Sequence, residues 1–168
     1  MTAAAKPDQR VLVGVDVGST SARAGAFDPA GRMLASASVG FDVNKPATDH
    51  LEHDSEQIWA AVAAAVRRAL AEGGIDPGRV AGLAFDATCS LVLLDAQGRP
   101  VTVSTTGADR WNVVMWADHR ALSEAAEITA TGHRALAYVG GTMSPEMELP
   151  KLLWLKRHLP DAWRRAGM

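Results

Sequence analysis

Cysteine is nearly absent from this sequence, since Cys89 is the only one among 168 residues. A single thiol excludes an internal disulfide bond and any cysteine-rich metal site, so a reducing compartment is the expected setting. The first residues contain no apolar signal segment, and no part of the chain reaches the run of about 18 apolar residues that a membrane-spanning helix requires. We therefore expect a cytoplasmic protein without a membrane partner.

An excess of charge of either sign is also lacking. The 17 basic and 19 acidic residues are interspersed, which gives a net charge of −2 and a pI near 6.2. This balance provides no electrostatic surface for nucleic acid or for an anionic membrane. With 48% hydrophobic and 21% charged residues, the composition is that of a globular domain with a buried core. Small molecules are the expected partners.

The third absence is the Walker phosphate loop. The pattern G-x-x-x-x-G-K-[ST] occurs nowhere in the chain. The most common architecture for binding a nucleoside triphosphate is therefore excluded, and any phosphate site must be built in another way.

Apolar periodicity predicts the elements that are present. Short apolar runs that end at turn residues predict six strands, at residues 11–16, 22–27, 33–41, 80–85, 91–94 and 112–116. Apolar positions at helical spacing predict a helix that Asp54 caps and Gly73 ends. Two further helices are expected at residues 118–131 and 150–158.

The order of these elements indicates the fold class. Residues 1–9 are Ala-rich and are expected to form a flexible tail, with one domain at residues 10–168. Three strands joined by tight turns predict an antiparallel meander. A meander followed by a helix and a parallel strand is the opening of the ribonuclease-H-like α/β fold, which actin-like ATPases use.

The segment between the first two strands is typical of a phosphate site. Asp16 ends a buried strand, a glycine turn follows, and three hydroxyl residues open the next strand, so amides and hydroxyls can face a phosphate. Mg²⁺ takes hard oxygen ligands and often only one or two carboxylates, so Asp16 is the candidate metal ligand. The candidate phosphate-binding residues are Gly18, Ser19, Thr20, Ser21 and Arg23. An ordinary hairpin, whose hydroxyls satisfy turn amides, is the alternative.

Polar and small residues follow the strand at 80–85. Asp86, Ala87, Thr88 and Cys89 lie where ligands bind in α/β sheets, at the carboxyl end of a strand. No base is identifiable beside Cys89, so we interpret it as inert rather than nucleophilic.

Three more candidates come from the second half of the chain. Trp116 could cover the C–H surface of a sugar while Asp118 accepts its hydroxyl groups. Asp118 could instead cap the helix that follows. Glu146 is an acid in an apolar stretch, and it is either a ligand or a solvated loop residue.

Four segments together resemble the N-terminal part of the first domain of FGGY-family carbohydrate kinases. Residues 14–23 resemble the family's first phosphate motif, and residues 82–90 resemble its first sugar-contact loop. Residues 115–120 are similar to its W-x-D-x-R segment, and residues 150–155 to its P-K-L-L-W helix start.

The resemblance implies an ATP-dependent sugar kinase that uses ATP and Mg²⁺, with a catalytic aspartate that deprotonates the sugar hydroxyl. That aspartate and the family's second domain would lie beyond Met168, so the chain alone is expected to be inactive, with no catalytic residue of its own. Surface that the remaining part of the domain would cover is expected to be exposed, which favours aggregation or a homodimer.

The same resemblance favours a ketopentose as substrate. Ala87-Thr88 stand where glycerol kinases have Arg-Glu and xylulokinases have Met-His, and the segment that ends at Glu146 resembles the serine-x-glutamate of ribulokinases. The expected reaction converts D-ribulose to D-ribulose 5-phosphate. The alternatives are a kinase for L-ribulose or another FGGY substrate, a non-catalytic sugar-binding module, and an actin-like ATPase. The last is disfavoured because it gives no reason for the sugar-loop segments.

Overall fold

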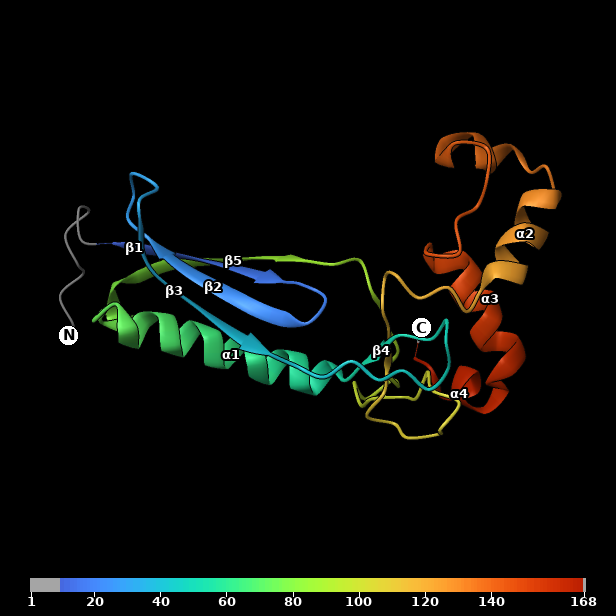
Figure 1. The fold of residues 1–168 in the computed structure, drawn as a ribbon, viewed down its shortest axis with the longest axis horizontal. Helices are drawn as coiled ribbons and strands as arrows, with labels where there is room; N and C mark the ends of the chain where they lie inside the picture. The colour runs from blue at the N-terminus through green and yellow to red at the C-terminus, as the bar shows by residue number, and fades with distance from the viewer. Residues whose placement is uncertain (1–9, 168) are drawn as a thin grey trace. The chain divides into compact units, whose positions relative to one another are not determined.

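The computed structural model of the chain describes residues 10–167 (Figure 1). The tail predicted at residues 1–9 lies outside the described residues. The chain divides into two compact units. The first unit takes in the chain up to Asp42 and Glu56–Thr88, and the second takes in Val43–Ser55 and the chain from Cys89 onward.

A four-stranded sheet is the centre of the first unit. Its strands are β1 (Val11–Val17), β2 (Ser21–Phe27), β3 (Met33–Gly40) and β5 (Val80–Ala87). They lie in the order β3-β2-β1-β5, with antiparallel pairing between β1 and β2 and between β2 and β3, and parallel pairing between β1 and β5. The predicted meander and the parallel strand after the helix are confirmed.

Helix α1 (Ser55–Glu72) covers one face of this sheet (Figure 1). Alternate residues of β1 and β2 turn toward the helix, because successive side chains of a strand point to opposite faces. The helix ends directly before Gly73, as predicted. Valine and alanine dominate the core that the helix and the sheet share. It contains Val11, Val13, Val15, Ala22, Ala24 and Ala26 of the sheet with Ala61, Val62, Ala65, Ala69 and Leu70 of the helix.

Strand β5 leaves apolar side chains exposed in the first unit. It is an outer strand of the sheet, and its free edge has no strand partner among residues 10–167. Leu83 and Phe85 point to the helix side in register with buried valines of β1, yet they are 45% and 53% exposed. The Phe85 ring lies 6.3 Å from the ring of Trp59, which is 65% exposed. We call Trp59, Leu83 and Phe85 the edge patch.

Within its described residues, the second unit contains a small antiparallel sheet and three α-helices. The strands β4 (Glu52–His53), β7 (Val113–Val114) and β6 (Leu91–Val92) lie in the order β4-β7-β6. The helices are α2 (Leu122–Ala130), α3 (Glu148–His158) and α4 (Pro160–Arg165), with a 3-10 helix (Arg134–Val139) between the first two. The hydrophobic core of the second unit consists of Leu93, Val101, Val103, Val114, Ala121, Trp154, Leu155 and Ala162.

Several element boundaries in this unit differ from the prediction. The helix expected at 118–131 begins at Leu122, and its N-cap residue is Ala121. The interpretation of Asp118 as a helix N-cap is therefore wrong. The strand expected at 112–116 is only two residues long, because the chain turns after Met115, whose carbonyl oxygen accepts the Asp118 N–H at 3.0 Å.

The last predicted helix begins earlier than expected, at Glu148 rather than Pro150. Proline is tolerated there because the N–H groups of the first helical turn have no partner within the helix. Helix α4 was not predicted from the sequence, although Pro160 occupies the first helical position that proline favours.

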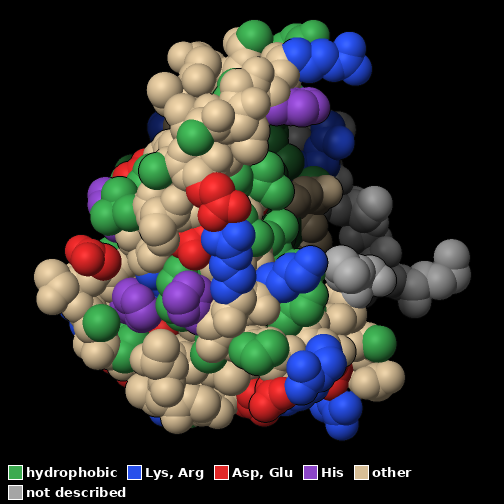
Figure 2. All heavy atoms as spheres, turned by 90° about the vertical axis from the view of Figure 1, so that its right-hand side faces the viewer, with side chains coloured by type: hydrophobic (Ala, Val, Ile, Leu, Met, Phe, Trp, Pro, Cys, Tyr) green, Lys and Arg blue, Asp and Glu red, His purple; other side chains and the backbone are tan. Residues whose placement is uncertain are grey.

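Charges of both signs lie on the face of the described residues that Figure 2 displays. Figure 2 shows Lys and Arg side chains interspersed with Asp and Glu on the face that it displays. Among the helices of residues 10–167, none has both the length and the apolar character needed to cross a membrane.

Candidate functional site

The hairpin between β1 and β2 brings Asp16 and Arg23 together. The antiparallel register makes them cross-strand partners, and Nη2 of Arg23 lies 2.6 Å from Oδ2 of Asp16. Both side chains are more than half exposed, on the face of the sheet opposite α1. An exposed carboxylate and guanidinium at one point can contact a metal-bound phosphate and the metal itself.

The turn of this hairpin is tight. The Gly18 N–H donates to the Ser21 carbonyl oxygen at 3.0 Å, so Ser19 and Thr20 lie at the tip. A Cβ atom on Gly18 would lie 3.2 Å from Nη2 of Arg23. A side chain at position 18 would therefore crowd the guanidinium of Arg23. This close approach explains why position 18 favours glycine. The Thr20 carbonyl oxygen accepts the Phe41 N–H at 3.0 Å, which fixes the tip to the end of β3.

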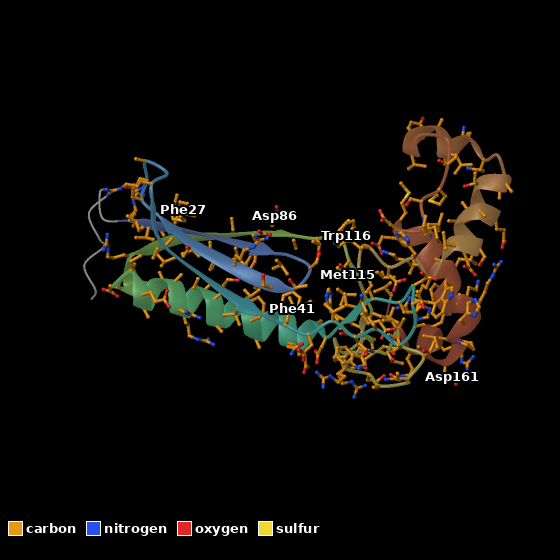
Figure 3. The ribbon with its side chains drawn as sticks, viewed as in Figure 1. Phe27, Phe41, Asp86, Met115, Trp116 and Asp161 are labelled. Carbon is orange, nitrogen blue, oxygen red and sulfur yellow. The ribbon has the colours of Figure 1, made fainter. Side chains whose placement is uncertain are left out.

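Asp86 extends this arrangement onto a third strand. The parallel register pairs Asp86 of β5 with Asp16 of β1, so Arg23, Asp16 and Asp86 form a row across three neighbouring strands. Figure 3 shows Asp86 on the side of the sheet that faces away from α1. Neighbouring strands are about 4.8 Å apart, so the two carboxylates can contact one ligand. Beyond the row, the Thr88 N–H donates to the Val17 carbonyl oxygen at 3.1 Å.

The donor set of this row fits Mg²⁺. Two carboxylates supply hard oxygen ligands, and phosphate oxygens and waters would complete the coordination. No group of three or more His, Cys, Asp or Glu side chains that could hold a metal alone occurs in residues 10–167. The row therefore matches a metal held jointly with a phosphate rather than a closed protein site.

In the second unit, Trp116 is held through its backbone. Its N–H donates to Oγ of Ser90 at 3.1 Å, and its carbonyl oxygen accepts from Nζ of Lys151 at 3.0 Å. Nζ of Lys151 also donates to the Met115 carbonyl oxygen at 3.0 Å. Lys151 has no exposed surface, and burial lowers the pKa of its ammonium group, against the opposing effect of Glu148.

Asp118 is fully enclosed in the same unit. Its carboxylate accepts from Nε and Nη2 of Arg120 at 2.9 and 2.8 Å and from the Leu51 N–H at 2.6 Å. Arg120 also donates to Glu52 at 2.9 Å and stacks over the ring of Trp154 at 4.9 Å. These contacts satisfy a buried ion-pair network, so Asp118 holds the turn of residues 115–120 in place. Its direct contact with a ligand stays a prediction.

Glu146 has a partner that the sequence did not reveal. Oε1 of Glu146 lies 3.0 Å from Nε2 of His119, and both side chains are partly exposed. The sequence gives no local sign of this contact, because 27 positions separate His119 from Glu146. Lys151 was also missed, although a lysine within the apolar run of residues 150–155 is a usable signal for a buried cation.

The predicted site residues fall into both units. The hairpin residues, Asp86, Ala87 and Thr88 belong to the first unit, whereas Cys89, Trp116, Asp118 and Glu146 belong to the second. Cys89 is a free and exposed cysteine. Each unit thus presents its own group of candidates: the row in the first, and the turn of Trp116 with Glu146 in the second.

The sheet order and the likeness to solved sugar kinases define the class, which is the actin-like, ribonuclease-H-like fold of the sugar kinases. Within it, the chain belongs to the FGGY family of carbohydrate kinases, because residues 11–168 match the model of that family's N-terminal domain. The predicted family and fold are confirmed.

Two relatives match more than nine tenths of the chain. It is 49% identical over 156 residues to an FGGY carbohydrate kinase domain-containing protein of Danio rerio, covering 92% of this chain and 28% of the relative. It is 44% identical over 156 residues to a D-ribulokinase of Saccharomyces cerevisiae, covering 91% of this chain and 22% of the relative. The chain thus spans less than a third of the length of these relatives.

Solved structures agree on the fold. The ligand-bound xylulose kinase of Lactobacillus acidophilus superimposes with a TM-score of 0.80 at 26% sequence identity. The superposition covers 94% of this chain and 30% of that one. The likeness is therefore again to one part of a longer kinase.

Proposed function

We propose that this chain is the N-terminal part of a kinase that transfers a phosphoryl group from ATP to D-ribulose and forms D-ribulose 5-phosphate. The observation that carries the phosphoryl-transfer role is the row of Arg23, Asp16 and Asp86 at the end of the hairpin. The identity of 44% with a yeast D-ribulokinase supports the choice of sugar, together with Ala87-Thr88 in the sugar loop.

In the first unit, the proposed roles follow from charge and position. Gly18 and the hydroxyl groups of Ser19, Thr20 and Ser21 lie against the phosphates of ATP. Arg23 neutralises the charge that develops on the transferred group. Asp16 holds Mg²⁺, which when bound would neutralise phosphate charge. Asp86 lies beside Asp16 and accepts a hydrogen bond from the sugar or from a water of the metal.

In the second unit, Trp116 covers the C–H face of the sugar and Glu146 accepts one of its hydroxyl groups. Cys89 of this unit is small and leaves room for the substrate, as do Ala87 and Thr88 of the first unit. We propose that Asp118 acts mainly through Arg120, which fixes the turn, since its own carboxylate is already occupied.

The general base of the reaction is proposed to lie beyond Met168, as the family resemblance implies. A base must reach the reacting hydroxyl within hydrogen-bond distance. None of the candidate acids of this chain matches the family's base. The chain by itself is thus proposed to bind ligands without turnover.

A substrate panel tests this proposal. D-ribulose, L-ribulose, D-xylulose and glycerol are offered with ATP to the full-length protein that contains this chain, and the same sugars are titrated calorimetrically into the 168-residue chain. We expect the highest kcat/KM with D-ribulose, and no turnover by the chain alone. Clear preference for xylulose or glycerol would contradict the proposal that D-ribulose is the substrate. Turnover by the chain alone would contradict the proposal that the general base lies beyond Met168. Sugar binding by a full-length protein that never turns over would favour the non-catalytic module.

A further inference from the structure

The pair formed by His119 and Glu146 lies in the segments to which we assign sugar binding. Nε2 of His119 and Oε1 of Glu146 are 3.0 Å apart, and the two side chains are 47% and 41% exposed. We propose that His119 is a specificity-determining residue of the sugar site, which orients the Glu146 carboxylate toward a substrate hydroxyl. This inference rests on the proposed sugar kinase function.

The turn that contains His119 presents few polar groups. Asp118 and Arg120, on either side of it, have side chains with no exposed surface and bind each other. Ala117 has no polar side chain, so the imidazole is the polar side-chain group that residues 117–120 offer to a ligand. A hydroxyl-rich substrate at this turn meets His119 before it can meet Asp118.

Both partners are held by their backbones. The His119 N–H donates to the Asp49 carbonyl oxygen at 3.0 Å. The Glu146 N–H donates to Oγ of Ser144 at 3.2 Å, two residues before α3 begins. Because each segment is fixed, the hydrogen bond between the side chains selects one orientation of the carboxylate.

The chemistry of the pair leaves an acceptor for the substrate. A carboxylate only accepts hydrogen bonds, so Nε2 of His119 carries the hydrogen and donates it to Oε1. Oε2 of Glu146 and Nδ1 of His119 make no hydrogen bond to any of residues 10–167. Oε2 is then a fixed acceptor for a sugar hydroxyl, and a site built around such an acceptor discriminates against a sugar whose hydroxyl points elsewhere.

An ordinary surface pair is the competing explanation, because exposed His–Glu pairs contribute little. The chain supplies a second His–Glu pair as a control, although its glutamate, Glu124, is buried. Nε2 of His158 lies 3.5 Å from Oε1 of Glu124 in the same unit, and His158 is 52% exposed, outside the candidate site.

The test compares three variants of the full-length protein in steady-state kinetics: His119→Ala, His119→Gln and His158→Ala. We expect His119→Ala to raise the KM for D-ribulose about tenfold and to lower the D-ribulose to D-xylulose ratio of kcat/KM, with the KM for ATP unchanged. His119→Gln keeps a side-chain N–H donor and should recover most of this loss. His158→Ala also removes the stacking of this ring on Trp154 at 4.7 Å, so it should lower stability but keep the wild-type KM for the sugar and the wild-type ratio of kcat/KM.

An unchanged sugar KM in His119→Ala overturns the inference, as does an equal change in His158→Ala. The proposed function is judged separately, on the wild type. If the wild type prefers another sugar, the D-ribulose proposal fails, while the KM for that sugar still tests His119. If the wild type shows no turnover, calorimetric sugar affinities replace KM. Absence of any sugar binding overturns both.

Discussion

Asp16 on β1 and Asp86 on β5 are register partners in the parallel pairing of the first unit. Arg23 completes the row from β2, with its guanidinium on the Asp16 carboxylate. Two like charges on neighbouring strands repel each other, and an arginine beside them reduces that repulsion. The row therefore combines a cation for phosphate with an acidic edge for a metal, and both features can be tested by substitution.

Replacing Arg23 by methionine should lower kcat of the full-length protein about 100-fold, because the guanidinium acts on charge that develops in the transition state. The KM for the sugar should change little. Arg32 is the matched control, since it pairs with Asp28 at 3.0 Å in the next hairpin turn and is also exposed. Arg32→Met should retain wild-type kcat. Equal losses in the two variants would mean that the hairpin serves only structure.

Replacing Lys151 by methionine should destabilise the protein by about 2–4 kcal/mol, measured by urea unfolding. The carbonyl oxygens of Met115, which is buried, and of Trp116, which is partly buried, would lose their donor. Because the same bonds fix the Trp116 turn, the KM for the sugar should rise while the KM for ATP stays constant. Lys156→Met is the control, since Lys156 is exposed on the same helix and should leave both quantities unchanged. If Lys151→Met unfolded at the urea midpoint of the wild type, the hydrogen bonds of Lys151 would not contribute to stability.

The first unit and the second differ in how far the sequence predicted them. Strong alternation in β1 and β2, and the Gly73 stop, determine the meander and α1 from local signals alone. The second unit depends on contacts between residues distant in sequence, such as Arg120 with Glu52 and Lys151 with Met115. Apolar runs indicated the places of β6 and β7 but not their two-residue lengths, and β4 was not predicted. For the site, the sequence indicated the candidate residues by their type and their position after the strands. The register that pairs Asp16 with Asp86, and the contact of His119 with Glu146, are tertiary relationships that no local pattern encodes.

His50 gives a pH-dependent prediction. Its Nδ1 atom is buried without a hydrogen-bond partner in the described structure, and its ring packs edge-on against Trp154 at 5.4 Å. Burial, and then the charge of Arg120, lower the pKa of the imidazole below its usual 6.5. The unfolded chain consequently binds the proton more readily, so stability falls as the pH drops below about 6.5 toward the folded pKa.

His50→Phe should remove this loss, because phenylalanine keeps the ring contact and has no polar atom to satisfy. We expect the variant to gain about 1 kcal/mol in unfolding free energy at neutral pH, and more at pH 5. Urea unfolding at the two pH values measures this difference. His133 is exposed and is the control site; His133→Phe should show the same pH dependence as the wild type. If the unfolding free energy of His50→Phe changed with pH as much as that of the wild type, His50 would not be the source of this pH dependence.

The edge patch predicts how the 168-residue chain behaves in solution. Trp59 and Phe85 expose 65% and 53% of their surface beside an unpaired strand edge, an arrangement that favours pairing with a second copy. We expect concentration-dependent association in analytical ultracentrifugation. Phe85→Lys with Trp59→Glu should shift the chain toward monomer, since a charge on an edge opposes association. Tyr138 is 91% exposed in the second unit, and Tyr138→Ser should leave association unchanged. A wild-type chain that stays monomeric and melts sharply and reversibly would show that the edge patch does not drive association. Equal effects of Tyr138→Ser and of the double substitution would show that the chains associate through another surface.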